Sequence, residues 1–458
     1  MGESGYSRFL PMILTLYSVL MWLLQPLVRA KLNRRARAEP GYGECIEERF
    51  GHYAETLGAA AGQAGDHDFY VWVHAVSLGE TRAAAVLVAQ LRLALPGMRL
   101  LLTHGTATGR EQGRALLREG DVQVWQPWDT PNAVQRFLTR FQPRVGLLME
   151  TEVWPNMVAA CARINMPLCL VNARLSEKSL RQAQLLVWLS GPAYRGLRAV
   201  WAQTSDDARR LSQLGAPVLG INGNFKFDAS PDPAQLEQAR VWRLALARPV
   251  VVFASSREGE EALLLDILKG FRALDPVEYA QTAIKNIASG VQWLIVPRHP
   301  QRFDAVVDLF QQQGFTVSRR SEWLGGPREA DIWVGDSLGE MALYYALSDV
   351  ALLGGSFAPL GGQNLIEAAA CGCPVVMGPH TFNFAQAAEL AMTAGAAAEA
   401  PDLQQAVNKV LALLRTAADL HAAGSAARAF GQAHRGAAAR TARAVQQLLD
   451  AGAALQER

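Results

Sequence analysis

The chain has 458 residues, of which 50% are hydrophobic and 19% are charged, and 44 Lys and Arg against 42 Asp and Glu give a net charge of +2. This length favours two domains with separate cores. A near-neutral charge argues against a nucleic-acid binder, which would carry a basic excess or a clustered basic face. The five cysteines have no regular spacing, so they indicate a reducing compartment rather than a disulfide framework.

The N-terminus carries an apolar stretch, residues 9–28, without a charged residue. A helix of this length would span about 30 Å, the thickness of a bilayer core. A basic cluster follows and favours the cytoplasmic side; it consists of Arg29, Lys31, Arg34, Arg35 and Arg37. A cleaved signal peptide is the rival interpretation, but the stretch is too long for a signal core. We therefore expect residues 1–38 to be an uncleaved anchor at the inner membrane, either spanning it or lying in one leaflet, with the remaining chain in the cytoplasm.

From residue 69 the chain alternates apolar strands with helical patterns, which is typical of parallel sheets covered on both faces. The expected strands are residues 69–75, 98–103, 144–149, 167–172, 249–254, 292–296, 332–334, 350–353 and 374–377. The expected helices between them are residues 79–95, 107–118, 131–141, 258–274, 300–312, 339–347 and 363–371. An Ala- and Arg-rich segment, residues 402–449, predicts a final long helix.

This pattern predicts an α/β protein with two Rossmann-like, doubly wound domains that face a cleft. The boundaries are expected at residues 39–222 for the first domain and 234–458 for the second, with a polar linker at 223–233. In such sheets, ligands bind beyond the carboxyl ends of the strands. The loops at those ends are therefore the candidate sites.

One tetrapeptide occurs once in each half, as Ser77-Leu78-Gly79-Glu80 and as Ser337-Leu338-Gly339-Glu340. Each copy follows a predicted strand and opens a predicted helix. A Ser-x-x-Glu sequence is also a capping box, in which serine caps the helix and glutamate reaches back. The position at the cleft edge favours a functional role, and the capping role stays open beside it.

A glycine-rich run follows the strand at residues 350–353, with Gly-Gly pairs at 354–355 and 361–362. Glycine lets the backbone approach a ligand, and the helix that follows would favour a phosphate at its N-terminus. That helix opens with Asn364-Leu365-Ile366-Glu367, where Glu367 suits a ribose diol. The alternative is that Asn364 and Glu367 form only a helix cap.

Three more strand-end segments and the domain junction carry polar side chains. Arg298, after Pro297, could pair with a phosphate or be a plain surface residue. Glu150 and Glu152 follow a strand, where acidic residues are also common partners of a helix dipole. Arg174 could contact an anionic group, and Lys226, at the domain junction, could reach the cleft or be solvated.

No metal site is expected. Asp66-His67-Asp68 is formally an Asp-x-Asp motif, but it precedes the first strand and so lies at the wrong end of the sheet. A dinucleotide fingerprint after the first strand is absent, which argues against a nicotinamide enzyme. A Gly-Lys-Ser/Thr phosphate loop is absent too.

Together these segments resemble the Kdo transferases of Gram-negative bacteria, which attach 3-deoxy-D-manno-octulosonic acid (Kdo) to lipid A precursors. The resemblance runs in order from the N-terminal anchor almost to the end of the chain. Its motifs are residues 74–80, 150–156, 172–176, 223–228, 297–300 and the run from 354 to 384.

This resemblance implies a GT-B glycosyltransferase that is inverting, needs no metal or other cofactor, and uses CMP-Kdo as its donor. By the same resemblance, Glu80 is the general base, and Glu150 and Lys226 stabilise the transition state. The CMP group would be held by Pro297, Arg298, Leu338, Gly339, Glu340, Asn364, Leu365, Ile366 and Glu367. The expected partners are CMP-Kdo, a lipid A precursor and anionic lipids of the inner membrane, with no nucleic acid.

Two alternatives stay open: another GT-B enzyme that uses a UDP-sugar, as transferase or 2-epimerase, and a membrane-bound sugar-binding or scaffold protein without catalysis. The resemblance also raises one electrostatic conflict. A helix N-terminus lowers the pKa of a carboxylate, which would make Glu80 a weaker base unless burial offsets the effect.

Overall fold

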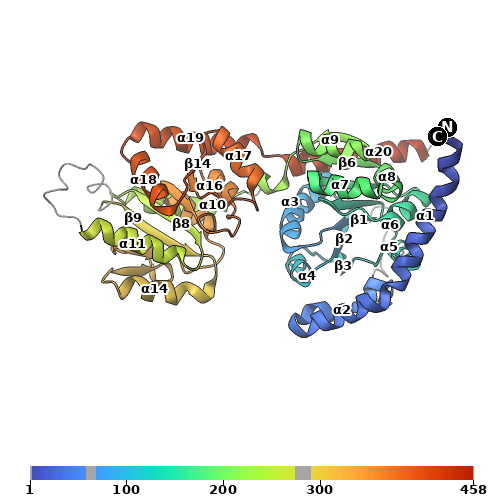
Figure 1. Cartoon of the computed structure of the whole chain (residues 1–458), viewed down its shortest axis with the longest axis horizontal. Helices are drawn as coiled ribbons and strands as arrows, with labels where there is room; N and C mark the ends of the chain where they lie inside the picture. The colour runs from blue at the N-terminus through green and yellow to red at the C-terminus, as the bar shows by residue number, and fades with distance from the viewer. Residues whose placement is uncertain (1–2, 58–68, 229, 274–289, 457–458) are drawn as a thin grey trace. The chain divides into compact units, whose positions relative to one another are not determined.

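The computed structural model describes residues 3–57, 69–228, 230–273 and 290–456. The chain divides into two compact units, and each is described here by itself (Figure 1). Unit 1 comprises Met1–Asp228 together with Arg435–Arg458, and unit 2 comprises Ala229–His434. Each unit is an α/β domain built on a parallel sheet of seven strands, as the strand and helix pattern predicts.

The sheet of unit 1 has the strand order β3-β2-β1-β4-β5-β6-β7. Its strands are β1 (Phe69–His74), β2 (Met98–His104), β3 (Val122–Trp125), β4 (Val145–Met149), β5 (Leu168–Ala173), β6 (Ala199–Ala202) and β7 (Val218–Ile221). Nearly every residue of β1, β2, β4 and β5 is buried, because helices cover both faces of the sheet.

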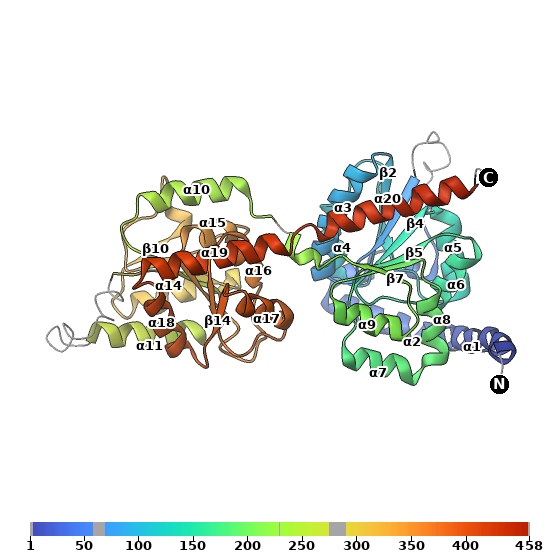
Figure 2. The ribbon, with the colours of Figure 1, turned by 90° about the horizontal axis from the view of Figure 1, so that it is seen from above.

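Two helix layers bury this sheet. Apolar side chains of α3 (Leu78–Ala94) and α20 (Ala437–Gln456) pack on one face. Those of α5 (Pro131–Phe141), α6 (Pro155–Arg163) and α9 (Ser205–Gln213) pack on the other. Besides the N-terminal helix pair, the described part of the unit contains the helices α4 (Ala107–Arg114), α7 (Glu177–Leu185) and α8 (Val187–Arg195), with short turns η1 (Pro40–Gly43), η2 (Ile46–Phe50) and η3 (Phe225–Asp228). Figure 2 shows α20 lying along the sheet beside α3.

The sheet of unit 2 has the order β10-β11-β9-β8-β12-β13-β14. Its strands are β8 (Val250–Ser256), β9 (Gln292–Pro297), β10 (Val317–Arg319), β11 (Ile332–Val334), β12 (Val350–Leu353), β13 (Val375–Met377) and β14 (Ala397–Glu399). Its helices are α10 (Pro233–Leu244), α11 (Glu260–Ala273), α14 (Phe303–Gln311), α15 (Met341–Leu347), α16 (Leu365–Ala370), α17 (Ala385–Thr393), α18 (Leu403–Leu413) and α19 (Ala417–Ala433), with short turns η4 (Pro300–Arg302) and η5 (Arg320–Glu322).

Each sheet has a point at which the strand order reverses. In unit 1, β1 pairs with β2 on one side and with β4 on the other. In unit 2, β8 pairs with β9 and with β12. In doubly wound folds this switch point, at the carboxyl ends of the strands, is where ligands bind.

The C-terminal segment differs from the prediction in two ways. Residues 402–449 form three helices instead of one, and α20 belongs to unit 1, although we expected residues 234–458 to form the second domain. The physical reason is that the start of α20 is hydrogen-bonded to the end of η3: the carboxylate of Asp228 accepts from the backbone N–H groups of Gly436, Ala437 and Ala438. The apolar face of α20 is then buried on the sheet of unit 1.

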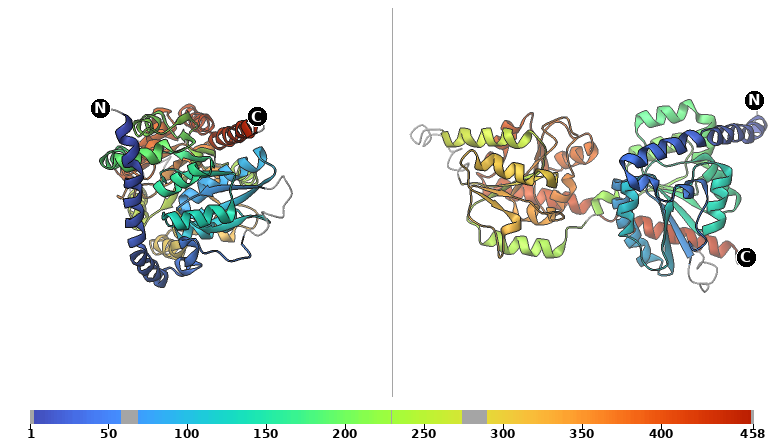
Figure 3. Two further views of the ribbon diagram at one scale, coloured as in Figure 1. Left: turned by 90° about the vertical axis from the view of Figure 1, so that its right-hand side faces the viewer. Right: turned by 90° about the horizontal axis from the view of Figure 1, so that it is seen from below.

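The N-terminal apolar stretch is not one straight helix. α1 (Glu3–Leu23) and α2 (Gln25–Ala38) meet at a 43° bend beside Pro26. Among the described residues, no helix is by itself long and apolar enough to cross a membrane, and only this bent pair taken together has the required length and composition. Figure 3 shows α1 running along the outside of unit 1.

Candidate active site

Glu80 lies at the carboxyl end of β1, in the first turn of α3. Ser77 caps this helix, and its hydroxyl also donates to Oε1 of Glu80 at 3.0 Å. The other carboxylate oxygen accepts from the backbone N–H of Val76 at 2.9 Å. The capping box expected as an alternative here is formed in a shifted version, because the glutamate accepts from the amide of Val76, one residue before the cap, and not from that of Ser77. These contacts hold the carboxylate at the switch point of unit 1.

Burial raises the pKa of Glu80 above the ordinary value of a glutamate. The Val76 amide and the Ser77 hydroxyl oppose this rise, whereas the charges of Glu150 and Glu152 add to it. Burial thus outweighs the two hydrogen bonds that stabilise the ionised carboxylate, and the pKa of Glu80 is raised although the residue lies in the first turn of a helix. A raised pKa makes the carboxylate a stronger base.

Glu150 follows β4, the other strand of the switch point. Its backbone is in the left-handed region with φ +59°, an uncommon conformation for a residue with a side chain. Its carboxylate is buried and pairs with Arg174 after β5, at 2.7 Å between Oε2 and Nε. Local strain of this kind clusters at functional sites.

Lys226 reaches the same edge of the sheet through a chain of amide hydrogen bonds. The side-chain oxygen of Asn172, at the end of β5, accepts from the backbone N–H of Phe225 at 3.1 Å. The side chain of Asn224 accepts from the Lys226 N–H at 3.0 Å and donates to Gln203. Unit 1 therefore brings Glu80, Glu150 and Lys226 to the carboxyl ends of neighbouring strands.

In unit 2, Pro297 ends β9, and Arg298 follows it with its side chain exposed. The Arg298 N–H donates to the carbonyl of Ser256, next to the switch point, at 3.0 Å. An exposed guanidinium held by its backbone at this edge has the chemistry to bind a phosphate.

The second Ser-x-x-Glu copy does not form the predicted capping box. α15 begins only at Met341, and Ser337 bonds to the side chains of Glu340 and Tyr344 instead of to a helix amide. The carboxylate of Glu340 also pairs with Arg320 at 2.7 Å. Leu338, by contrast, is 75% exposed, and Gly339 is exposed beside it.

At the end of the glycine-rich run, Asn364 caps α16. Its side chain accepts from the Ile366 N–H at 3.1 Å and donates to Glu367 at 3.0 Å, so the capping contacts left open as an alternative are formed. Leu365 is buried with Ile366, whereas Glu367 is exposed.

Glu260, which the sequence did not single out, lies at the same edge of the sheet of unit 2. It opens α11, it is 2% exposed, and its carboxylate accepts from the Gly355 N–H of the glycine-rich run. The sequence does show an acidic residue in the first turn of a helix that follows a buried strand. That pattern is common, and it does not indicate that the carboxylate binds a segment far along the chain.

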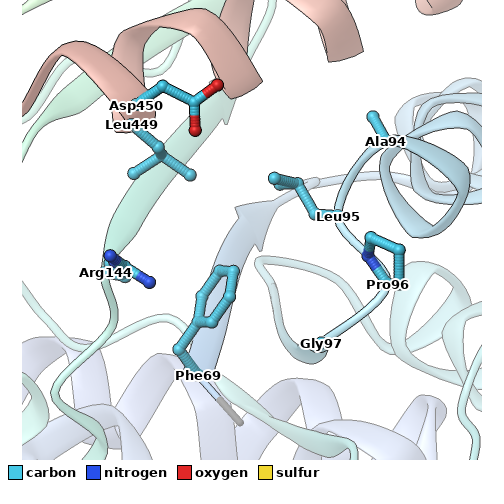
Figure 4. Close-up of a pocket in the computed structure, with 8 residues that line it drawn as sticks. All are labelled: Phe69, Ala94, Leu95, Pro96, Gly97, Arg144, Leu449 and Asp450. Atoms are coloured by element: carbon cyan, nitrogen blue, oxygen red, sulfur yellow. The ribbon is translucent and has the colours of Figure 1, made fainter. Parts of the chain in front are cut away.

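The described part of the chain contains no group of three or more His, Cys, Asp or Glu side chains that could hold a metal ion. The motif Asp66-His67-Asp68 lies outside the described residues. One pocket of unit 1 lies at the opposite edge of the sheet (Figure 4). Phe69, Gly97 and Arg144 line it at the amino ends of strands, so it is not part of the candidate site.

Residues 44–229 match the family model of 3-deoxy-D-manno-octulosonic-acid transferases. A 3-deoxy-D-manno-octulosonic acid transferase of Bordetella pertussis is 45% identical over 94% of this chain and 99% of that protein. The C-terminal CMP-Kdo binding domain of WaaA from Acinetobacter baumannii is 30% identical over 43% of this chain and 98% of that one, with a TM-score of 0.37. The UDP-GlcNAc 2-epimerase of Neisseria meningitidis shares the fold, at a TM-score of 0.53 over 83% of this chain and 99% of that one, with 14% identity.

The extent and identity of the Bordetella match, together with the family model over the first unit, decide the assignment. The two parallel α/β units agree with the GT-B glycosyltransferase architecture that the resemblance implies. The chain belongs to the 3-deoxy-D-manno-octulosonic acid transferase family and is a glycosyltransferase.

Proposed function

We propose that this protein transfers Kdo from CMP-Kdo to the lipid A precursor lipid IVA, with inversion and without a metal. The observation that carries the proposal is the carboxylate of Glu80, held by two hydrogen bonds at the switch point of unit 1 with its pKa raised by burial. Such a group accepts a proton from a sugar hydroxyl more readily than an ordinary glutamate does.

In this proposal Glu80 takes the proton of the acceptor hydroxyl as its oxygen attacks the anomeric carbon of Kdo. The bond from that carbon to the phosphate of CMP breaks on the opposite face, so a single displacement inverts the configuration. Lys226 would stabilise the negative charge that develops as CMP leaves. Glu150, paired with Arg174, would stabilise the positive charge on the sugar ring.

Unit 2 would hold the donor. Arg298 would pair with the phosphate, and the turn containing Leu338, Gly339 and Glu340 would contact the nucleoside. The segment from Asn364 to Glu367, with buried Leu365 and Ile366, would hold the remaining polar groups of CMP. Glu367 is exposed and accepts from Asn364, so its carboxylate could bind a ribose diol.

We further propose that the N-terminal helices attach the protein to the cytoplasmic face of the inner membrane. One side of α1 is fixed to unit 1, because Tyr17 donates to Asp129 at 3.0 Å and Ser18 donates to Asn156 at 2.9 Å. Large apolar side chains of the helix pair remain exposed; they are Met12, Leu16, Val19, Leu20, Trp22, Leu23 and Leu27.

An apolar segment and a group of basic residues lie close to this apolar surface in unit 1. A second exposed apolar segment, Leu185 to Trp188, lies at the start of α8, which α1 contacts. The exposed basic residues of α2 would pair with anionic headgroups; they are Lys31, Arg34, Arg35 and Arg37. This arrangement favours a helix pair that lies in one leaflet over one that spans the bilayer.

The test is transfer from CMP-Kdo to lipid IVA in the presence of a chelator, with the products identified by mass. A gain of one or more Kdo units supports the donor, the acceptor and the independence from metal together. Glu80→Gln should reduce kcat at least about a hundredfold while CMP binding is kept, since general base catalysis contributes about that much. Full activity of this variant would overturn the assignment of the base, and binding of UDP instead of CMP would overturn the donor.

A further inference from the structure

The buried carboxylate of Glu260 joins the two loops at the switch point of unit 2. Its two oxygens lie 2.9 and 2.8 Å from the backbone nitrogen of Gly355, after β12. Oε1 also accepts from the Phe357 N–H at 3.3 Å, and Oε2 accepts from the Arg257 N–H at 2.9 Å. One side chain from the start of α11 thus accepts from amides of the loop after β8 and of the glycine-rich run.

The two loops pack so closely that the run has little freedom. A Cβ atom on Gly354 would lie 2.3 Å from the carbonyl oxygen of Ser255, so no other residue fits there without movement of the backbone. Gly355 has φ +68° and Ser255 has φ +56°, both in the left-handed region. A conformation of this kind persists only when its surroundings fix it.

The contact at Gly355 continues to the segments proposed to hold the donor. The carbonyl of Gly355 accepts from the Gly362 N–H at 2.8 Å, which folds the far end of the run back toward the cap of α16 at Asn364. On the other side, the carbonyl of Ser256 accepts from the Arg298 N–H at 3.0 Å. Glu260 therefore lies between both segments and is connected to each through backbone hydrogen bonds.

We propose that Glu260 is a positioning residue for the sugar-nucleotide donor. It fixes the backbone of the glycine-rich run, and through it the start of α16, in the conformation that receives a cytidine nucleotide bearing an acidic sugar. Glu260 itself does not touch the donor. This inference rests on the proposed binding of CMP-Kdo to unit 2.

The chemistry of the contact requires a carboxylate. An ionised carboxylate offers only acceptors, and here it receives N–H groups from three residues. A glutamine of the same shape would turn an NH2 group toward one of these amides. At least one buried donor would then be left without a partner, which is the costly case.

The test uses the full-length protein and the variant Glu260→Gln. We expect the Kd for CMP and the KM for CMP-Kdo to rise about tenfold, in line with the loss of charge-assisted hydrogen bonds. The KM for the acceptor and the kcat at saturating donor should stay close to those of the wild type. A residue with a general structural role would change all of these values together or none of them.

Glu261→Gln is the matched control. Glu261 is also buried and adjacent in sequence, but its carboxylate bonds to the side chains of Ser256 and Arg302 and to no amide of the glycine-rich run. We expect this variant to lose thermal stability like Glu260→Gln and to keep its affinity for CMP. Equal losses of CMP affinity in both variants would overturn the proposal.

A second measurement does not depend on the variant folding. In the wild type without CMP, the amides of Gly355 and Phe357 should exchange slowly with deuterium, because the carboxylate already holds them. Exchange at the rate of an open loop would overturn the proposal. If the wild type itself bound no CMP, the proposed function would fail; if it bound CMP and Glu260→Gln bound it equally well, only the role of Glu260 would fail.

Discussion

The guanidinium Nε of Arg174 lies 2.7 Å from Oε2 of Glu150, so the ends of the neighbouring strands β5 and β4 are joined by an ion pair at the switch point of unit 1. The carboxylate is buried, whereas the arginine side chain is 59% exposed. An arginine this exposed adds little to stability. The ion pair instead holds the carboxylate of Glu150 in place, and the charge of this carboxylate raises the pKa of Glu80.

Arg174→Ala should therefore lower kcat about tenfold and leave the melting temperature nearly unchanged. Arg174→Lys should recover only part of the activity, because an ammonium group keeps the charge without the planar fork. Transfer kinetics and a thermal melt measure both effects. Arg209→Ala is the control, since the side chain of Arg209 is 61% exposed, like that of Arg174, and pairs with the exposed Asp206 on α9. Wild-type kcat in Arg174→Ala would contradict the assignment.

Ser77→Ala should shift the acid limb of the pH profile of kcat/KM to higher pH. The Ser77 hydroxyl lowers the pKa of Glu80, so its removal lets burial raise that pKa further. A general base works when deprotonated, and activity is lost as the pH falls through its pKa, so a higher pKa moves this loss upward.

The control for Ser77→Ala is Ser176→Ala, which removes the cap of α7. Each variant should lose about 1 kcal/mol of helix capping. Only Ser77→Ala should move the acid limb, and a profile that stays in place would show that Glu80 is not the titrating base.

Asp129→Asn should flatten the dependence of stability on acidic pH. Burial raises the pKa of Asp129 to about 6, although the carboxylate accepts from the amides of Asn156 and Met157. Between about pH 4 and this pKa, the folded protein therefore binds more protons than the unfolded chain. The contribution of protonated Asp129 to the free energy of unfolding is fully present below about pH 4 and is lost as the pH rises through about 6.

Between pH 4 and pH 7 the wild type should lose about 2 kcal/mol more unfolding free energy than the variant. Urea unfolding at a series of pH values measures the difference. Glu111→Gln serves as the control, because Glu111 has a 72% exposed side chain. Identical slopes for the wild type and Asp129→Asn would contradict the raised pKa.

Asp228→Ala should loosen the C-terminal helix from unit 1. The variant loses the carboxylate that accepts from the backbone of Gly436, Ala437 and Ala438, at a cost of about 1 to 2 kcal/mol. Hydrogen exchange of α20 should speed up in the variant.

Asp232→Ala gives the comparison for Asp228→Ala. Asp232 caps α10 in unit 2, so its loss removes a similar cap without touching α20. Unchanged protection of α20 in Asp228→Ala would mean that the buried apolar face of the helix holds it without the carboxylate.

Among the described residues, the sequence predicted every strand of five or more residues and, of the shorter ones, β11, β12 and β13. Residues 332–334 and 350–353 match β11 and β12, and the helix at residues 131–141 matches α5, because continuous apolar runs and a proline at a helix start are local signals. β3, β6, β7, β10 and β14 were missed. They have three or four residues each, and β3, β7, β10 and β14 also contain partly exposed positions, whereas the equally short β11 and β12 are continuous buried apolar runs.

In the candidate site, too, some contacts follow from the sequence and others do not. Ser77 and Glu80 are three residues apart, so their capping box is a local feature that the sequence predicts. The identical spacing at Ser337 and Glu340 failed, because Tyr344 and Arg320 take the two side chains and α15 starts later. The spacing alone could not separate the two cases.

By itself, the sequence determined the α/β class, the family and the strand ends at which Glu80, Glu150 and Arg298 lie, since each of these follows from local periodicity or from a motif. Only the tertiary structure decided that burial raises the pKa of Glu80, that α20 belongs to unit 1, and that Glu260 holds the glycine-rich run. The physical reason is the distance along the chain over which each effect acts. Periodicity and capping act over a few residues, whereas desolvation and hydrogen bonds such as the one from Gly355 to Glu260 join segments about a hundred residues apart, and only folding brings these together.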